Sequence, residues 1–214
     1  MDETKTDWQI ISRVANQLGF QYPYACPEDI LGEINRVIPA YGGITPERLK
    51  GNINGLTWPC PTPDHPGTPI LHSETFRTAD GLGKFIPVQY QPPAELPDDE
   101  YPLVLTTGRV VMHYNAGSMT RRTAALLKRS PEPFVEIHPD DAQKLGITAD
   151  EEVKITTRRG DTLARASITQ KLSPGVVFMP FHFPGTNMLT VDALDKTAKI
   201  PEFKVAACKI TKNL

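Results

Sequence analysis

Cysteine is scarce in this chain of 214 residues, which contains only Cys26, Cys60 and Cys208. The three lie far apart, and none belongs to a Cys-x-x-Cys pair. Zinc and iron–sulfur centres held by protein need several thiolates at close spacing, so the sequence argues against a self-contained centre of either kind. We therefore expect buried or incidental thiols, and any metal to be held through a cofactor.

Long apolar runs and an excess of charge of one sign are also missing. No stretch reaches the roughly 20 apolar residues of a membrane-spanning helix, so membrane insertion is not expected. Residues 1–5 lack the charged-then-apolar order of a signal peptide, which favours a cytoplasmic location. The formal net charge is −2, which gives no reason to expect nucleic acid as a partner.

Recognisable catalytic motifs are missing too. The chain has neither a Gly-x-Ser-x-Gly elbow nor a Walker-type glycine loop, and the acidic pair Asp140-Asp141 lies where it would cap a helix. No catalytic residue is therefore assigned. Hydrophobic residues make up 39% and charged residues 22% of the chain, values typical of a folded protein with room for one domain and an appendage.

The first part of the chain has the pattern of helices followed by an irregular arm. Apolar residues at helical spacing predict a helix over 8–18, and Gly19 is well placed to end it. Flanking prolines predict a second helix over 27–38, and Thr45 begins a short third one. Residues 51–73 are rich in Pro, Gly, Asn and Thr, which indicates an irregular arm or linker.

A stretch rich in Pro, Asp and Glu at 91–100 marks the join between two domains. We therefore divide the chain into residues 1–100 and 101–214, with a strand expected at 85–90 before the join. The helices of the first part have a large apolar face. That face either meets a partner outside the chain or folds back on the second domain.

The second part, from residue 101, is predicted to be mainly β with some α. Turns at 158–161 and 173–175 separate neighbouring strands, and two helices are expected over 120–128 and 139–145. About six strands with two interposed helices suit a small closed barrel, which has no exposed edges. The strands are expected at 103–107, 134–137, 153–157, 163–168, 176–181 and 205–210.

Residues 101–123 contain the strongest functional signal. A short apolar strand runs into Gly108 and Arg109, and a polar loop leads to a helix start near Arg121. Glycine permits close approach of the backbone, helix N-terminal amides attract anionic oxygen, and arginine offers a planar fork for phosphate. This order suits a site for an extended phosphorylated ligand. The alternative is an ordinary strand-to-loop turn with surface arginines, which has the same pattern.

Several further blocks occur in a fixed order along the chain. They are Trp58-Pro59-Cys60, residues 81–85, Thr107-Gly108-Arg109 with His113, residues 117–122, 138–142 and 157–160, residues 177–181 with Asn187, and residues 200–204. Together they resemble the C-terminal part of the molybdopterin oxidoreductases known as the dimethyl sulfoxide reductase superfamily. Within it they are most similar to formate dehydrogenase catalytic (alpha) subunits, over nearly the whole chain.

The resemblance implies a six-stranded double-psi β-barrel, similar to aspartate decarboxylase, preceded by a small helical segment and an irregular arm. Complete catalytic subunits of this family are several times longer, so the chain resembles their C-terminal piece. The iron–sulfur cluster, the substrate-facing residues and any export signal would lie in the missing part. The implied partners are the remainder of the catalytic subunit and its electron-transfer subunits.

The implied cofactor is a pair of pterin guanine dinucleotides that hold one molybdenum or tungsten. Arg109 would contact phosphate or pterin, and Asn187 a heterocycle edge. His113 is either a pterin contact or a satisfied structural histidine, and surface roles are the alternative for Arg109 and Lys204. The implied cofactor-binding residues are Thr107, Gly108, Arg109, His113, Asn115, Ser118, Met119, Thr120, Phe181, His182, Asn187, Phe203 and Lys204.

The resemblance therefore implies a segment that helps hold a bispterin metal cofactor for two-electron interconversion of formate and carbon dioxide. Such a segment is not active alone. One alternative is a non-catalytic barrel module for subunit docking or assembly. Another is the same segment of a nitrate reductase-like member of the superfamily.

Overall fold

The structure, a computed structural model, describes residues 3–213 and divides into two compact units. The first unit ends at Pro87 and the second begins at Val88, so residues 88–100 group with the barrel.

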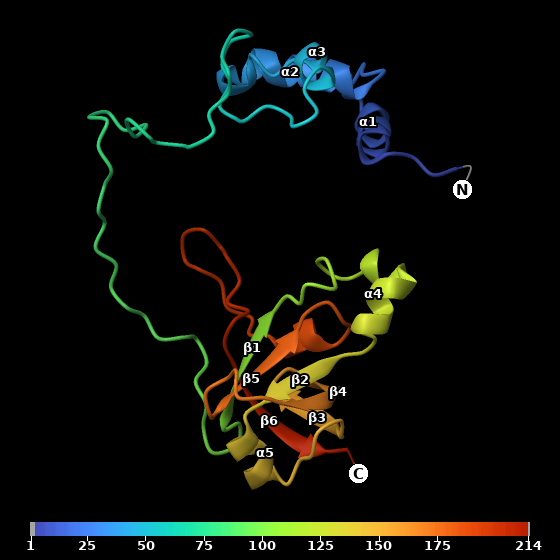
Figure 1. Ribbon diagram of the computed structural model, residues 1–214, viewed down its shortest axis with the longest axis vertical. Helices are drawn as coiled ribbons and strands as arrows, with labels where there is room; N and C mark the ends of the chain where they lie inside the picture. Colours follow the sequence, from blue (N-terminus) through green and yellow to red (C-terminus); the bar gives the residue numbers. More distant parts are fainter. Residues whose placement is uncertain (1–2, 214) are drawn as a thin grey trace. The chain divides into compact units, whose positions relative to one another are not determined.

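The first unit begins with the three helices expected from the sequence, α1 (Asp7–Gln17), α2 (Pro27–Val37) and α3 (Pro46–Lys50), with the 3-10 helix η1 (Pro39–Tyr41) between the last two (Figure 1). The first residue of α2 and of α3 is a proline, which has no amide hydrogen to leave unsatisfied there. Gly19 follows α1 with a φ of +89°, the left-handed conformation in which glycine commonly ends helices. Apolar residues of α1 such as Ile11 and Val14 are more than half exposed.

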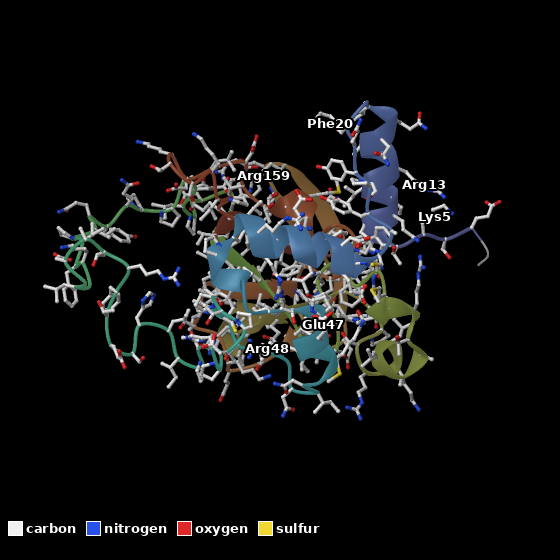
Figure 2. The ribbon with its side chains drawn as sticks, turned by 90° about the horizontal axis from the view of Figure 1, so that it is seen from above. Lys5, Arg13, Phe20, Glu47, Arg48 and Arg159 are labelled. Atoms are coloured by element: carbon white, nitrogen blue, oxygen red, sulfur yellow. The ribbon has the colours of Figure 1, made fainter. Side chains whose placement is uncertain are left out.

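Arg48 of α3 organises the irregular arm that follows (Figure 2). Its guanidinium donates to the carbonyl of Gly43 at 2.6 Å and to that of His65 at 2.8 Å. It also lies 3.3 Å from the buried Sγ of Cys60. The arm around residues 57–68 is thus ordered by side-chain hydrogen bonds. The strand expected at 85–90 is wrong: these residues pair with no strand, and Phe85 is fully exposed.

The second unit is a closed barrel of six strands. The strands are β1 (Leu103–Gly108), β2 (Phe134–Ile137), β3 (Glu152–Thr157), β4 (Gly160–Ile168), β5 (Val176–Pro180) and β6 (Ala206–Lys212). Their order around the barrel is β1-β5-β2-β4-β3-β6, with β1·β5 and β2·β4 parallel and the other pairs antiparallel. The strand pairings stay the same when β1, β2 and β3 are exchanged with β4, β5 and β6, respectively. The barrel therefore consists of two halves with equivalent strand pairing.

This arrangement confirms the six-stranded double-psi barrel implied by the resemblance. Alternate side chains point inward in β1 and β3; in β1, for example, Leu103 and Leu105 are buried. Cys208 also lies in this core, where burial raises the pKa of its thiol to about 12. Fully buried side chains of the core include Leu105, Val135, Ile137, Val153, Ile155, Val177 and Met179.

Short helices cover the connections of the barrel. The helix expected over 120–128 is wrong as a single element. Thr123 adopts extended angles (φ −94°, ψ 108°) and separates the 3-10 helix η2 (Thr120–Arg122) from α4 (Ala124–Arg129). The second expected helix is confirmed as α5 (Pro139–Leu145), and η3 (Thr186–Leu189) is an additional turn. Among the described residues, no helix has the length and apolar character needed to cross a membrane.

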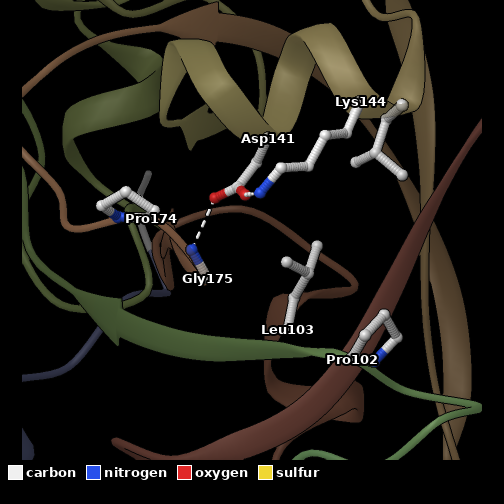
Figure 3. A pocket seen from close by; sticks show the side chains of 7 residues that line it. Pro102, Leu103, Asp141, Lys144, Pro174 and Gly175 are labelled. Atoms are coloured by element: carbon white, nitrogen blue, oxygen red, sulfur yellow. Dashed lines mark hydrogen bonds and ion pairs between the residues drawn. The ribbon is translucent and has the colours of Figure 1, made fainter.

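The Asp140-Asp141 pair lies in the first turn of α5, as the sequence indicates. Asp141 is buried, and its carboxylate accepts from the amide of Gly175 at 2.5 Å and pairs with Lys144 at 3.4 Å. Figure 3 shows Asp141 and Lys144 beside a pocket that is also lined by Pro102, Leu103 and Pro174. Because its carboxylate is already paired within the protein, Asp141 fastens α5 to the start of β5.

Candidate cofactor site

The candidate site begins where β1 ends at Gly108. A Cβ atom at this position would lie 2.6 Å from Cε2 of Phe178 on the neighbouring strand β5, so only glycine fits without a shift. The Gly108 carbonyl accepts from the Phe181 amide at 3.1 Å. The ends of β1 and β5 therefore stay side by side, and the loops that follow them begin at the same end of the barrel.

His182 fastens the loop after β1 to the loop after β5. Its Nε2 accepts from the amide of Val110 at 2.9 Å, so the proton of this neutral ring is on Nδ1, which donates to the carbonyl of Asn115. The ring is 1% exposed. Both nitrogens are engaged by backbone, so His182 positions the opening loop rather than presenting a free donor.

His113 has a comparable position inside the same loop. Its Nε2 donates to the carbonyl of Ser130 at 2.8 Å, and Nδ1 lies 3.2 Å from Oγ1 of Thr120. The ring packs edge-on against Phe183 at 5.3 Å between centroids and is buried. Of the two roles left open for His113, the structure favours the satisfied structural histidine.

A cleft of about 550 Å³ opens beside this loop. Three segments form it: the end of β1, the region around η3 that follows β5, and residues 201–204. Two of the lining side chains are cations, and none carries a carboxylate. The lining residues are Arg109, Phe181, Asn187, Thr190, Pro201, Phe203 and Lys204.

Arg109 is exposed at the cleft and is held from two sides. Its Nη2 donates to Oδ1 of Asn115 at 3.1 Å, and its Cζ lies 5.7 Å from the centre of the Phe181 ring. Asn115 has a φ of +46°, a conformation that asparagine tolerates better than most residues. The guanidinium is therefore oriented, and within residues 3–213 most of its donors have no hydrogen-bond partner, which leaves them available to an anionic ligand.

The closing segment is fixed to the end of β1 through Thr107. The buried Thr107 hydroxyl donates to the carbonyl of Phe203 at 2.7 Å, and the Lys204 ammonium donates to the carbonyl of Thr107 at 2.6 Å. The Lys204 ammonium also lies 5.5 Å from the centre of the Phe203 ring. Thr107 is thus a support for the cleft, whereas Phe203 and Lys204 line it.

Asn187 lies in η3 and is exposed. Its amide side chain has no hydrogen bond within residues 3–213, so both its carbonyl and its amino group are available to a ligand edge. The preceding residue, Thr186, is buried and donates to the carbonyl of Pro180 at 3.0 Å, which fixes the start of the turn.

The structure brings together five of the implied cofactor residues on one cleft and places the others around the opening loop. Ser118 and Met119 are exposed outside the cleft lining, and Thr120 accepts from the amide of Tyr114 at 3.2 Å. Sequence reasoning missed Thr190 and Pro201: the Thr190 hydroxyl donates to the Asn187 carbonyl at 2.8 Å, and proline has no polar side-chain group. The five residues are Arg109, Phe181, Asn187, Phe203 and Lys204.

The residues present fit a pterin dinucleotide. Such a ligand has anionic phosphates, hydrogen-bonding edges and flat ring faces, and the cleft offers two cations, a free amide and two aromatic rings. Nearby, the buried Nε of Arg121 has no hydrogen-bond partner among the described residues, which is unusual for a charged donor. The described residues contain no group of three or more His, Cys, Asp or Glu side chains able to hold a metal.

Comparisons with known proteins show what the chain is similar to. Residues 103–207 match the family model Molydopterin dinucleotide binding domain. The chain is 50% identical over 212 residues to the F420-dependent formate dehydrogenase subunit alpha of Methanocaldococcus jannaschii, covering 97% of this chain and 31% of that protein. It is 40% identical to the assimilatory nitrate reductase catalytic subunit of Bacillus subtilis, again covering 97% of this chain and 31% of that protein.

A solved structure shows the same fold over most of the chain. Acetylene hydratase from Pelobacter acetylenicus aligns with a TM-score of 0.66 at 19% identity, covering 98% of this chain and 33% of that one. The chain thus spans about a third of the length of these relatives. Residues 103–207 belong to the molybdopterin dinucleotide-binding domain family, and the chain is similar over nearly its whole length to catalytic subunits of the molybdopterin oxidoreductase superfamily.

Proposed function

We propose that this chain is the C-terminal segment of a formate dehydrogenase catalytic subunit and that its cleft holds one part of a bispterin cofactor. The observation that carries the proposal is the cleft itself, where Arg109 and Lys204 face a space without carboxylates beside the free amide of Asn187. The similarity to formate dehydrogenase alpha subunits over 97% of the chain supports formate as the substrate.

The chemistry of each lining residue indicates which part of the cofactor it would bind. Arg109 would bind an anionic oxygen, Asn187 would bind a heterocycle edge, and Phe203 would pack against a ring face. When bound, the cofactor supplies the two-electron redox chemistry through molybdenum or tungsten. The role of this chain is binding and orientation, and it is not active alone.

The rest of the enzyme lies outside this chain. We propose that the remainder of the subunit provides the iron–sulfur cluster and the substrate-facing residues, and that electron-transfer subunits accept the electrons. A cytoplasmic location also remains a proposal. The similarity to a nitrate reductase catalytic subunit makes a nitrate reductase-like parent the second candidate.

Arg109→Ala tests the cofactor role in the enzyme assembled with the remainder of its subunit. Loss of a charged hydrogen bond costs about 1.5–3 kcal/mol, so we expect roughly 10- to 100-fold weaker retention of the pterin dinucleotide. Cofactor content is measured as pterin released per chain, and circular dichroism checks the fold. Arg129→Ala, an exposed arginine of α4 away from the cleft, is the matched control.

Both possible results are informative. Loss of pterin in Arg109→Ala with full content in Arg129→Ala supports the proposal. Equal pterin content in both variants would contradict it and would favour a barrel that serves only docking or assembly.

A further inference from the structure

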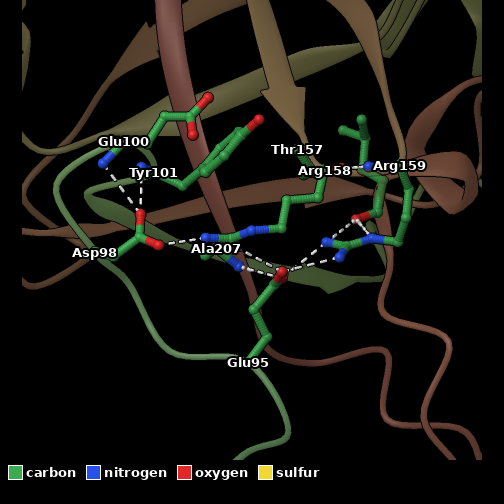
Figure 4. Close-up of polar contacts among 9 residues, drawn as sticks. Glu95, Asp98, Glu100, Tyr101, Thr157, Arg158, Arg159 and Ala207 are labelled. Atoms are coloured by element: carbon green, nitrogen blue, oxygen red, sulfur yellow. Dashed lines mark hydrogen bonds and ion pairs between the residues drawn. The ribbon is translucent and has the colours of Figure 1, made fainter.

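Glu95, in the segment that leads into the barrel, accepts hydrogen bonds from the turn between β3 and β4 and from β6 (Figure 4). Its side chain is 11% exposed. Arg159 donates to both carboxylate oxygens, at 2.9 and 2.8 Å, and Arg158 donates to one of them at 2.7 Å. The amide of Ala207 at the start of β6 donates at 2.8 Å. Such a carboxylate is fully satisfied, which makes it a fixed anchor for Arg159.

Arg159 also contacts η3, which forms one wall of the cleft. Its Nε and Nη2 donate to the carbonyl of Leu189 at 3.2 and 3.1 Å. Leu189 is the last residue of η3, between the cleft residues Asn187 and Thr190. All three guanidinium nitrogens are therefore used within the protein, and Arg159 acts on the cleft only through the turn that it holds.

The segment that contains Glu95 also contacts residues 201–204, which form another wall of the cleft. The amide of Ala94 donates to Oε1 of Glu202 at 3.0 Å, and Glu202 lies between the lining residues Pro201 and Phe203. Residues 94–95 thus contact the closing segment directly, while Arg159 contacts η3.

We infer that Arg159, anchored on Glu95, is a positioning residue that fixes the η3 wall of the cofactor cleft. A lysine has a point charge and cannot replace a planar fork that satisfies a carboxylate and a carbonyl together. Without the fork, the Leu189 carbonyl loses both of the side-chain donors that hold it, and the turn bearing Asn187 gains freedom. The inference rests on the proposed function where it concerns cofactor, but the restraint on η3 is a property of this chain alone.

Arg158 provides the matched control. It shares Glu95 and also pairs with Asp98, but no hydrogen bond of its side chain reaches η3. Arg158→Ala therefore removes the same charge from the same turn and leaves the contact between Arg159 and Leu189 in place.

The first measurement is hydrogen–deuterium exchange on the full 214-residue chain without cofactor. We expect exchange of amides in 186–190 to be on the order of 10-fold faster in Arg159→Ala than in wild type, and near wild type in Arg158→Ala. Amides of β2 serve as the internal reference and should not change. Equal effects of the two variants, or faster exchange spread evenly over the barrel, would overturn the inference.

The second measurement separates the positioning role from the cofactor proposal. In the assembled enzyme, Arg159→Lys should release pterin dinucleotide faster than Arg158→Lys does, and it avoids any folding defect of the alanine variant. Wild-type pterin release in Arg159→Lys, while Arg109→Ala loses pterin, would overturn the positioning of cofactor. A failure of Arg109→Ala to lose pterin would instead contradict the proposed function and leave the exchange result to decide the restraint on η3.

Discussion

At the scale of single residues, the carboxyl of Glu95 has a strongly lowered pKa. The hydrogen bonds from Arg159 lower its pKa to about 2, helped by the Ala207 amide and Arg158 and opposed by burial. Its deprotonated form is therefore more stable in the folded barrel than in the unfolded chain, where the pKa is near 4.5. The folded barrel loses this contribution as the carboxyl is protonated.

This depression predicts how barrel stability depends on pH. The contribution of Glu95 is complete above about pH 4.5 and is lost as the pH falls toward 2, because the folded pKa is the lower one. After allowance for solvent screening, we expect about 2 kcal/mol. Urea unfolding from pH 6 to 2.5 measures it, and Glu95→Gln should flatten the profile. Glu100→Gln, an exposed carboxyl, is the control; identical profiles for the two variants would contradict the assignment.

At the scale of elements, the opening loop depends on a turn at Gly117. This glycine has a φ of +70°, and a Cβ atom there would lie 2.8 Å from Nε of Arg121 and 3.0 Å from the His182 carbonyl. Gly175 has a comparable φ of +84° but open space around its Cβ position. The two glycines share backbone strain and differ in packing.

Replacing each glycine by alanine separates these two effects. Gly175→Ala should cost about 1–2 kcal/mol, the penalty of left-handed backbone for an L-residue. Gly117→Ala should cost more, because the backbone carbonyl of His182 cannot move away as a flexible side chain can. Urea midpoints of the barrel transition measure both, and equal losses would show that the opening loop is not closely packed at Gly117.

The strands were predictable from the sequence because alternation of buried and exposed side chains has a period of two, and the barrel confirms it. The failures have local causes. Thr123 interrupts a run of helical pattern between η2 and α4, and the apolar residues at 85–90 find no strand to pair with. Propensity alone does not reveal the second outcome, because a strand also needs a partner strand elsewhere in the chain.

Part of the candidate site was likewise predicted from the sequence, and part was not. Arg109, Asn187 and Lys204 were predicted from their chemistry and from the resemblance, and they line one cleft. Arg159 was not predicted, because the sequence shows it only as part of a turn after β3. Its importance depends on Glu95, which precedes it by 64 residues. Long-range pairs of this kind leave no signal in a single sequence.

At the scale of the whole molecule, the unit boundary predicts where the barrel can be cut. Residues 88–100 include Glu95 and Asp98, which hold the turn between β3 and β4. A chain of residues 88–214 should therefore be more stable than one of residues 101–214, by about 2 kcal/mol or more. Thermal unfolding compares them, with Glu95→Gln in the longer chain expected to remove most of the difference. Equal melting temperatures would show that the segment does not stabilise the barrel.

Native mass spectrometry of the protein purified from its own cells tests most directly whether this chain holds a molybdopterin dinucleotide as part of a larger catalytic subunit. We expect a species far heavier than the 23.7 kDa of this chain, which includes the remainder of the subunit and the mass of a pterin dinucleotide. A species of 23.7 kDa with neither addition would contradict the proposed function.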